Sequence, residues 1–186
     1  MLYKNHLLVS TAVAMPVMNQ TGALTVSNML ALWLGAVLPD IDEPESYIGR
    51  RTRGISDLIN LIFGHRGITH TLLFIGIMGI LVFLFGFKEI GFWLVVGAFL
   101  HILEDSFSKS GVKWLLPLTD KTYHVPIYTT GSLIEFLIGI SAGIYLCIAF
   151  KLQLFEFQKD DFLNINNLLN IVLGLKDTFL TQVLLE

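Results

Sequence analysis

The stretch GHRGITHTLLFIGIMGILVFLFGF, residues 64 to 87, sets two histidines and an arginine directly before a long run of apolar side chains. No residue from Thr71 to Phe87 carries a charge, and the run is long enough for one membrane-spanning helix. An ionised side chain at the centre of a bilayer costs about 2.5 kcal/mol or more. His65, Arg66 and His70 therefore belong at the edge of a span, where an interaction must offset their desolvation.

The composition extends this prediction to the whole chain. Of the 186 residues, 54% are hydrophobic and 15% are charged, and the mean hydropathy is +0.69. These values predict an all-α, polytopic membrane protein. A net charge of -3 leaves no basic patch, which excludes nucleic acid as a partner. The single cysteine, Cys147, excludes a disulfide framework and a thiolate metal site.

Apolar runs separated by turn-forming residues predict about five membrane-embedded helices. The first and fourth runs are short, so either could be a tilted or half-inserted helix. Together they form a predicted membrane domain over residues 1–150, followed by an amphipathic or interfacial tail over residues 151–186. The five runs are His6–Val17, Ala23–Leu38, Thr71–Phe87, Ile90–Leu103 and Ser132–Phe150.

The distribution of Lys and Arg predicts how the spans are oriented. In a five-span arrangement, eight of the twelve basic residues fall on the face that carries the N-terminus and the loops 39–70 and 108–131. The other four fall on the opposite face. By the positive-inside rule the first face is cytoplasmic, which predicts a multi-pass protein of a bacterial inner membrane.

Eight acidic and histidine side chains that are far apart in the sequence lie near the cytoplasmic ends of these spans, so they can converge at one depth. Crowded carboxylates repel one another strongly at low dielectric. One or two divalent cations would offset that repulsion, and imidazole with carboxylate but no thiolate favours zinc or manganese. The candidate metal ligands are His6, Asp40, Asp42, His65, His70, His101, Asp105 and Glu135.

Two short motifs within this set have a spacing that suits a metal site. In HILED, residues 101–105, a helix would place His101 and Asp105 on one face, one turn apart. In LPDID, residues 38–42, an extended segment would direct Asp40 and Asp42 to the same side. Taken singly, the first motif also suits a hydrogen-bonded pair at a helix end, and the second suits a solvated acidic turn.

Several motifs, in this order, resemble the YdjM-like family of bacterial inner-membrane proteins, described as LexA-regulated, membrane-bound, metal-dependent hydrolases. They are His6, GAVLPDID, GHRGITHTLLF, HILEDSFSKSGVKWLLPL and TGSLIE, and they cover roughly residues 1–150. The HRG-x-x-H and LPD-x-D parts are the most specific. The resemblance implies a membrane-embedded hydrolase whose acidic and histidine motif positions correspond to the eight candidate ligands.

The expected chemistry is hydrolysis by water that a divalent metal activates. Asp42, Glu104 or Glu135 could serve as the general base. Arg66 could bind an anionic group, because the guanidinium fork suits phosphate. A site at headgroup depth favours a phospholipid or another membrane-partitioning phosphoester as substrate.

A divalent-metal or proton transporter is the alternative, because acids and histidines inside a membrane also mark ion pathways. Transporters carry polar side chains across the midplane and often contain two related halves. In the middles of the third and fifth predicted spans, Ser141 and Tyr145 are the only polar side chains. This pattern favours a site on one side of the membrane, and thus the hydrolase.

Overall fold

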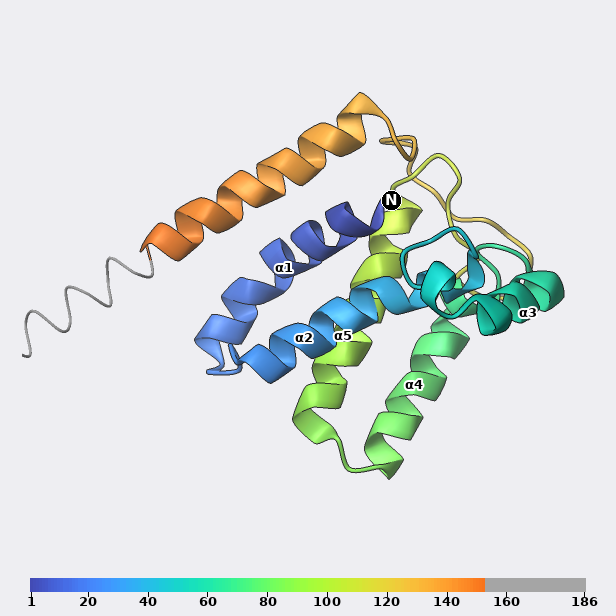
Figure 1. Ribbon diagram of the computed structural model, residues 1–186, viewed down its shortest axis with the longest axis horizontal. Coiled ribbons are helices and arrows are strands. Elements are labelled where there is room, and N and C mark those ends of the chain that lie inside the picture. Colours follow the sequence, from blue (N-terminus) through green and yellow to red (C-terminus); the bar gives the residue numbers. More distant parts are fainter. Residues whose placement is uncertain (153–186) are drawn as a thin grey trace, which may run out of the picture. The chain divides into compact units, whose positions relative to one another are not determined.

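The computed structural model describes residues 1–152, and these residues are helical with irregular connections (Figure 1). Within them no β-strand forms, and two isolated bridges join parts of the segment after α5. This confirms the predicted all-α class. The helices are α1 (Tyr3–Gln20), α2 (Val26–Val37), η1 (Leu38–Asp42), η2 (Gly49–Arg51), α3 (Arg53–Phe63), η3 (Ile68–His70), α4 (Leu72–Leu84), α5 (Lys88–Ser106) and a final helix, Leu133–Leu152.

The helix boundaries follow from local sequence signals. Thr25 caps α2 by accepting a hydrogen bond from the backbone N–H of Asn28, and Pro39 follows its last turn. Thr71 caps α4 by accepting from the N–H of Phe74. The HRG-x-x-H motif thus lies in the short connection between α3 and α4, directly before the apolar helix that it introduces.

Helices α2 and α5 form the closest helix contact, and glycines make it possible. A Cβ atom added at Gly35 or Gly97 would lie 2.0 or 2.1 Å from a backbone oxygen of the opposite helix. Only a residue without a side chain allows this approach. His101 follows Gly97 by one turn, so the crossing brings His101 to the C-terminal end of α2, where η1 begins.

Apolar and polar side chains are distributed differently from those of a water-soluble domain. A small apolar cluster joins α1, α2 and α5 through Met18, Leu32 and Trp93. Many other large apolar side chains are exposed, most of all on α3, α4 and the final helix. Several ionisable side chains are instead fully buried, as suits a protein whose surroundings are partly lipid. These buried side chains are His6, Asp42, His70, His101 and Glu135.

One helix in the described part of the chain, Leu133–Leu152, is long and apolar enough to cross a bilayer. The helices α2 and α4 have 12 and 13 residues, hence lengths of about 18 to 20 Å, against a hydrocarbon core of about 30 Å. Helix α1 has 18 residues but buries the polar side chains of His6, Ser10 and Thr11. The five predicted runs therefore all form helices, while five complete spans are not confirmed.

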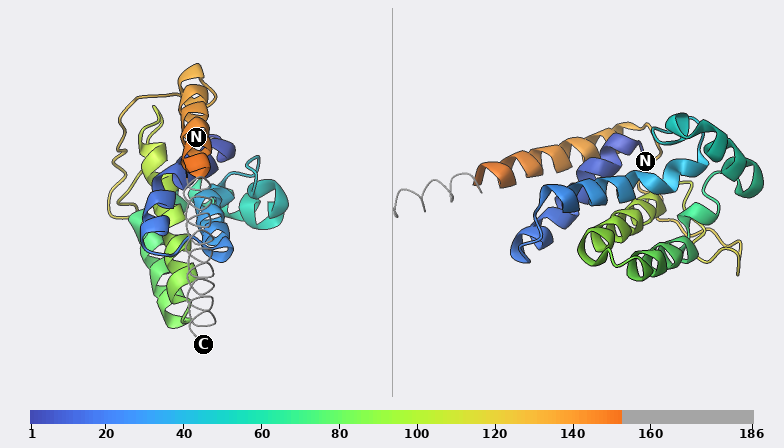
Figure 2. Two further views of the ribbon diagram at one scale, coloured as in Figure 1. Left: turned by 90° about the vertical axis from the view of Figure 1, so that its left-hand side faces the viewer. Right: turned by 60° about the horizontal axis from the view of Figure 1, so that its bottom comes forward.

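The sequence did not predict α3, which forms within what was expected to be a cytoplasmic loop. Figures 1 and 2 show α3 in teal at the edge of the molecule, away from α1. The chain divides into two compact units, residues 1–144 and a second unit that begins at Tyr145. Apart from residues 151 and 152, the predicted interfacial tail lies outside the described residues.

Candidate metal centre

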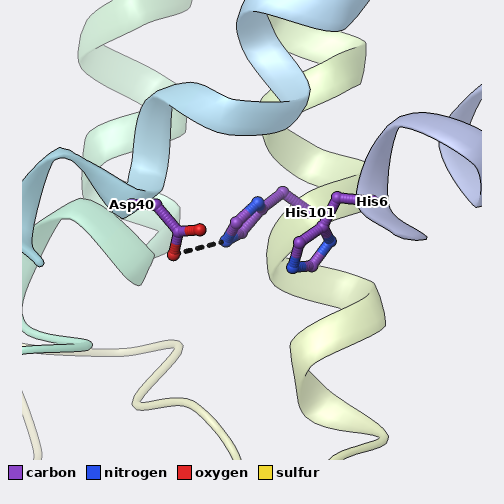
Figure 3. Close-up of side chains that lie close together, drawn as sticks. All are labelled: His6, Asp40 and His101. Atoms are coloured by element: carbon purple, nitrogen blue, oxygen red, sulfur yellow. Dashed lines mark ion pairs between the residues drawn. The ribbon is translucent and has the colours of Figure 1, made fainter. Parts of the chain in front are cut away.

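Five of the predicted ligands converge on one buried place in the first unit. Two groups of three residues could each hold an ion, and within each group the three donor atoms lie within 4.8 Å of one another. His101 belongs to both groups. Figure 3 shows His6 from α1, Asp40 from η1 and His101 from α5 directed toward a common space. The first group is His6, Asp40 and His101, and the second is His70, His101 and Asp105.

The three buried histidines share one hydrogen-bonding pattern. In each, the Nδ1 atom faces an oxygen atom. A carbonyl oxygen and an ionised carboxylate only accept hydrogen bonds, so each Nδ1 carries a proton, and in the neutral form of each imidazole Nε2 presents a lone pair. The pairs are His6 with Glu104 Oε2 at 2.6 Å, His70 with Asp42 Oδ2 at 3.2 Å, and His101 with the Ala36 carbonyl oxygen at 2.7 Å.

These lone pairs meet one another and have few partners. The Nε2 atoms of His70 and His101 are 3.2 Å apart, so two lone pairs would face each other across this gap if both rings were neutral. The Nε2 atom of His6 is buried, forms no hydrogen bond with the described residues and lies 3.5 Å from Asp105 Oδ1. A proton or a cation between these nitrogens removes the repulsion. A metal ion is the partner that accepts several such lone pairs at once.

The spacing of the donor atoms fits a small divalent ion. From His101 Nε2 to Asp40 Oδ1 the distance is 3.5 Å, and from His70 Nε2 to Asp40 Oδ1 and Asp105 Oδ2 it is 3.8 and 3.9 Å. Ligands about 2.1 Å from a tetrahedral zinc ion would be about 3.4 Å apart. The donor chemistry and the spacing therefore both fit a metal such as zinc or manganese, with histidine orientation already fixed by outer oxygen atoms.

Asp42 lies beside this donor group and orients it. Its Oδ2 accepts a hydrogen bond from the Thr69 hydroxyl at 2.6 Å and faces His70 Nδ1, while its Oδ1 is 3.1 Å from His65 Nδ1. Burial acts to raise the pKa of Asp42, but hydrogen bonds from His65 and His70 outweigh it and hold the pKa below its ordinary value. Asp42 is thus an ionised acceptor that fixes His70.

Asp40 is ionised as well. Burial acts to raise its pKa, but the electrostatic interaction and the contact with His101 outweigh burial, so that the pKa falls below the ordinary range. The Asp40 carboxylate is therefore available as an anionic donor at neutral pH.

His65 stands at the edge of the site rather than within it. Its side chain is 41% exposed, and besides Asp42 it has Glu43 Oε2 at 3.5 Å from Nδ1. Burial acts to lower the pKa of His65, and the hydrogen bond with Asp42 raises it above the ordinary value. Neither His65 nor Asp42 belongs to the two donor groups.

The two glutamates predicted as bases have other partners. Glu104 binds His6 Nδ1 through one oxygen and accepts from the Ser10 hydroxyl at 2.8 Å through the other. Glu135 accepts hydrogen bonds from the backbone N–H groups of Leu2 and Gly131 and from the Asn5 side chain. Glu104 therefore orients His6, whereas Glu135 connects the final helix to the start of α1 and lies outside the donor groups.

Arg66 points into the site, and its contacts are mostly with protein groups. Its backbone adopts a positive φ of 56°, and its Nη2 is 2.7 Å from Asp105 Oδ2. Its Nη1 donates to the Ser108 hydroxyl at 2.9 Å and to the carbonyl oxygen of Gly111 at 3.1 Å. Arg66 thus fixes the carboxylate of Asp105 and holds the loop after α5 against the site.

A cavity of about 460 Å³ opens beside the donor group. Because it reaches Asp40 and Asp105, a small molecule in it would touch the donors directly. Its wall carries charges of both signs. The charged and histidine side chains around it include Asp40, Glu43, Arg50, His65, Arg66 and Asp105.

Several outer residues of the site were not predicted from the sequence. Ser10 could have been found, because it follows His6 by one helical turn in HLLVS and so shares its face. The carbonyl oxygen of Ala36 carries no sequence signal. Tyr128, whose hydroxyl donates to the carbonyl oxygen of Glu104 at 2.8 Å, reaches the site through the folding of the long loop after α5.

The comparisons with known proteins agree on one family. A sequence model of the family described as YdjM inner membrane protein matches residues 1–173. The uncharacterized protein YvsG of Bacillus subtilis is 34% identical over 119 residues, which are 63% of this chain and 74% of YvsG. Inner membrane protein YdjM of Escherichia coli is 37% identical over 92 residues, which are 45% of this chain and 46% of that protein. No solved structure matches this chain significantly.

Proposed function

Because the chain belongs to the YdjM inner membrane protein family, we propose that its buried donor group binds metal and that the protein is a membrane-bound, metal-dependent hydrolase. The observation that carries the proposal is the convergence of three histidine Nε2 atoms with two carboxylates, each Nδ1 being held by an oxygen atom. Such outer oxygen atoms are typical of protein metal sites.

His6, Asp40, His70, His101 and Asp105 would hold one or two ions, zinc or manganese by preference. A bound divalent ion would act as a Lewis acid and would lower the pKa of water toward 7. Glu104, Asp42 and the Ala36 carbonyl oxygen keep the three imidazoles in the tautomer that presents Nε2. Arg66 keeps the carboxylate of Asp105 in place.

His65 is the best placed group for proton transfer. It borders the cavity, and its contact with Asp42 places the Nδ1 proton on the inner side, which leaves Nε2 to take up or release a proton. Asp42, Glu104 and Glu135 have their carboxylate oxygens engaged, so we assign them positioning roles. The raised pKa of His65 favours its protonated form and hence a role in protonating a leaving group.

The substrate class follows from the site's surroundings. The family is one of inner membrane proteins, and the excess of Lys and Arg on one face orients the site toward the cytoplasm. In this arrangement five helices would be embedded in the membrane, namely α1, α2, α4, α5 and the final helix. The shorter ones would cross only part of it. The cavity would then lie near the headgroups, where Arg50 could meet the phosphate of a phospholipid or another membrane-partitioning phosphoester.

The activity test uses purified protein in detergent micelles with added zinc or manganese and a panel of phosphoesters that partition into micelles. We expect hydrolysis that chelators abolish and that His65→Ala reduces. His124→Ala is the matched control, because His124 lies in an exposed loop outside both donor groups. Metal-dependent ion flux in sealed proteoliposomes, with no hydrolysis of any phosphoester, would instead support the transporter.

A further inference from the structure

Helix α3 presents most of its apolar side chains outward, and the side chains of Ser56 and Asn60 inward. Ser56 is fully buried, and the Asn60 side chain donates a hydrogen bond to the carbonyl oxygen of Asp42 at 2.6 Å. The apolar side chains are instead open to the surroundings, with Leu61 82% exposed. The exposed apolar set is Ile55, Leu58, Leu61, Ile62 and Phe63.

The arrangement is the reverse of a helix on the surface of a water-soluble domain. There, the apolar stripe faces the core and the charged residues face water. Here α3 packs mainly on the two short turns η1 and η2, and Figures 1 and 2 show it apart from α1. Its outward face therefore has no protein partner among the described residues, and water is a poor one.

Basic residues directly before α3 indicate what covers this face. Arg50, Arg51 and Arg53 are all exposed and stand at the N-terminal end of the helix. A strong apolar face beside clustered arginines is the pattern of helices that lie in the plane of a membrane interface. Anionic headgroups attract such arginines, whereas a second copy of the chain would bring a second arginine cluster against them.

We propose that α3 lies in the headgroup layer of an anionic bilayer, with Leu58, Leu61 and Ile62 inserted toward the acyl chains. The proposal depends on the membrane location of the family and not on hydrolase activity. It has a structural consequence for the site. Since α3 ends at Phe63 and holds Asp42 through Asn60, the helix that contacts lipid also borders the residues that orient His70.

The experiment measures how deeply single spin labels on α3 sit in a bilayer. The background variant is Cys147→Ala, which removes the one native cysteine. Labels are attached at Leu58→Cys and Ile62→Cys, and at Asp57→Cys as the matched control. Asp57 is exposed on the same helix, about 100° around it from Leu58 and about 140° from Ile62. The full-length protein is reconstituted in vesicles of phosphatidylethanolamine and phosphatidylglycerol.

We expect the labels at positions 58 and 62 to be relaxed by oxygen and protected from a water-soluble nickel chelate, while the label at 57 remains accessible to the chelate. Replacing both lipids with phosphatidylcholine should reduce the protection. Equal chelate accessibility at all three positions would overturn the proposal. So would protection from both relaxing agents together with a dipolar coupling between labels, because that result indicates a second copy on this face.

Discussion

The histidine tautomers are the central feature at the residue scale. For each of His6, His70 and His101 an oxygen atom fixes the proton on Nδ1, so the chelating atom is set before any ion binds. Buried polar groups are normally hydrogen-bonded, yet the Nε2 atom of His6 has no such partner among the described residues. The arrangement is understandable if a cation binds between the three imidazoles.

Glu104→Ala tests the role of an outer residue. The change removes the acceptor of His6 Nδ1 and should weaken metal binding about tenfold to a hundredfold, the range typical of such outer residues. Competition with a chromophoric chelator measures the affinity. Asp120→Ala is the control, because the Asp120 side chain is 85% exposed. Unchanged affinity in Glu104→Ala would show that the His6 contact has no role in binding.

Arg66→Gln tests the ion pair with Asp105. Removing one partner of a buried ion pair typically costs about 3 to 5 kcal/mol when the other is left unpaired, and we expect less here because Asp105 also pairs with the N-terminal ammonium of Met1. We expect a clear fall in the thermal unfolding temperature of the metal-free protein in detergent, and a smaller fall when metal is present, since an ion would also neutralise Asp105. A variant as stable as the unmutated protein would contradict this role.

The sequence predicted which residues could meet, but not all of their roles. It placed eight side chains near one end of the spans, and five of them form the donor groups. Asp42, His65 and Glu135 are near that end too, yet they contact other groups. Position along a helix indicates depth in a membrane, whereas the direction of a loop side chain depends on backbone angles such as the positive φ of Arg66.

At the scale of elements, the contact between α2 and α5 determines whether His101 reaches Asp40. Gly97→Ala would place a Cβ against a backbone oxygen of α2 and force the helices apart, which we expect to cost about 1 to 3 kcal/mol. The same variant should hold less metal. Gly79→Ala in α4 is the matched control, because a Cβ there meets nothing within 4 Å. Thermal unfolding temperature and metal content are measured for both glycine variants. Equal values in Gly97→Ala and Gly79→Ala would contradict this account.

The sequence predicted five helices well because long apolar runs are a strong signal. It missed α3 because this helix has only 11 residues and its apolar positions lie in a segment that charge and proline mark as a loop. Five complete spans are not confirmed, because only Leu133–Leu152 in the described part of the chain is long and apolar enough. Helices α1 and α5 are long, but each carries buried polar residues that belong to the site and not to a lipid-facing surface.

At the scale of the whole molecule, the family and the exposed apolar surface agree on a membrane setting, and the charge distribution predicts its orientation. Single cysteines at Asp57 and Ser110, in the Cys147→Ala background, test that orientation. Both positions are exposed, whereas Ser56 is buried and would be unreactive on either side. An impermeant thiol reagent should label both only after the cells are permeabilised. Labelling of either cysteine in intact cells would show that the predicted orientation is wrong.

The most direct test of the central claim is elemental analysis of the purified protein and of two histidine variants. If the donor group is a metal centre, the unmutated protein holds at least one zinc or manganese ion per chain. His101→Ala should lose most of it, because His101 belongs to both donor groups, while His124→Ala should retain it. Metal at background level in the unmutated protein, or equal metal content in all three, would contradict the claim.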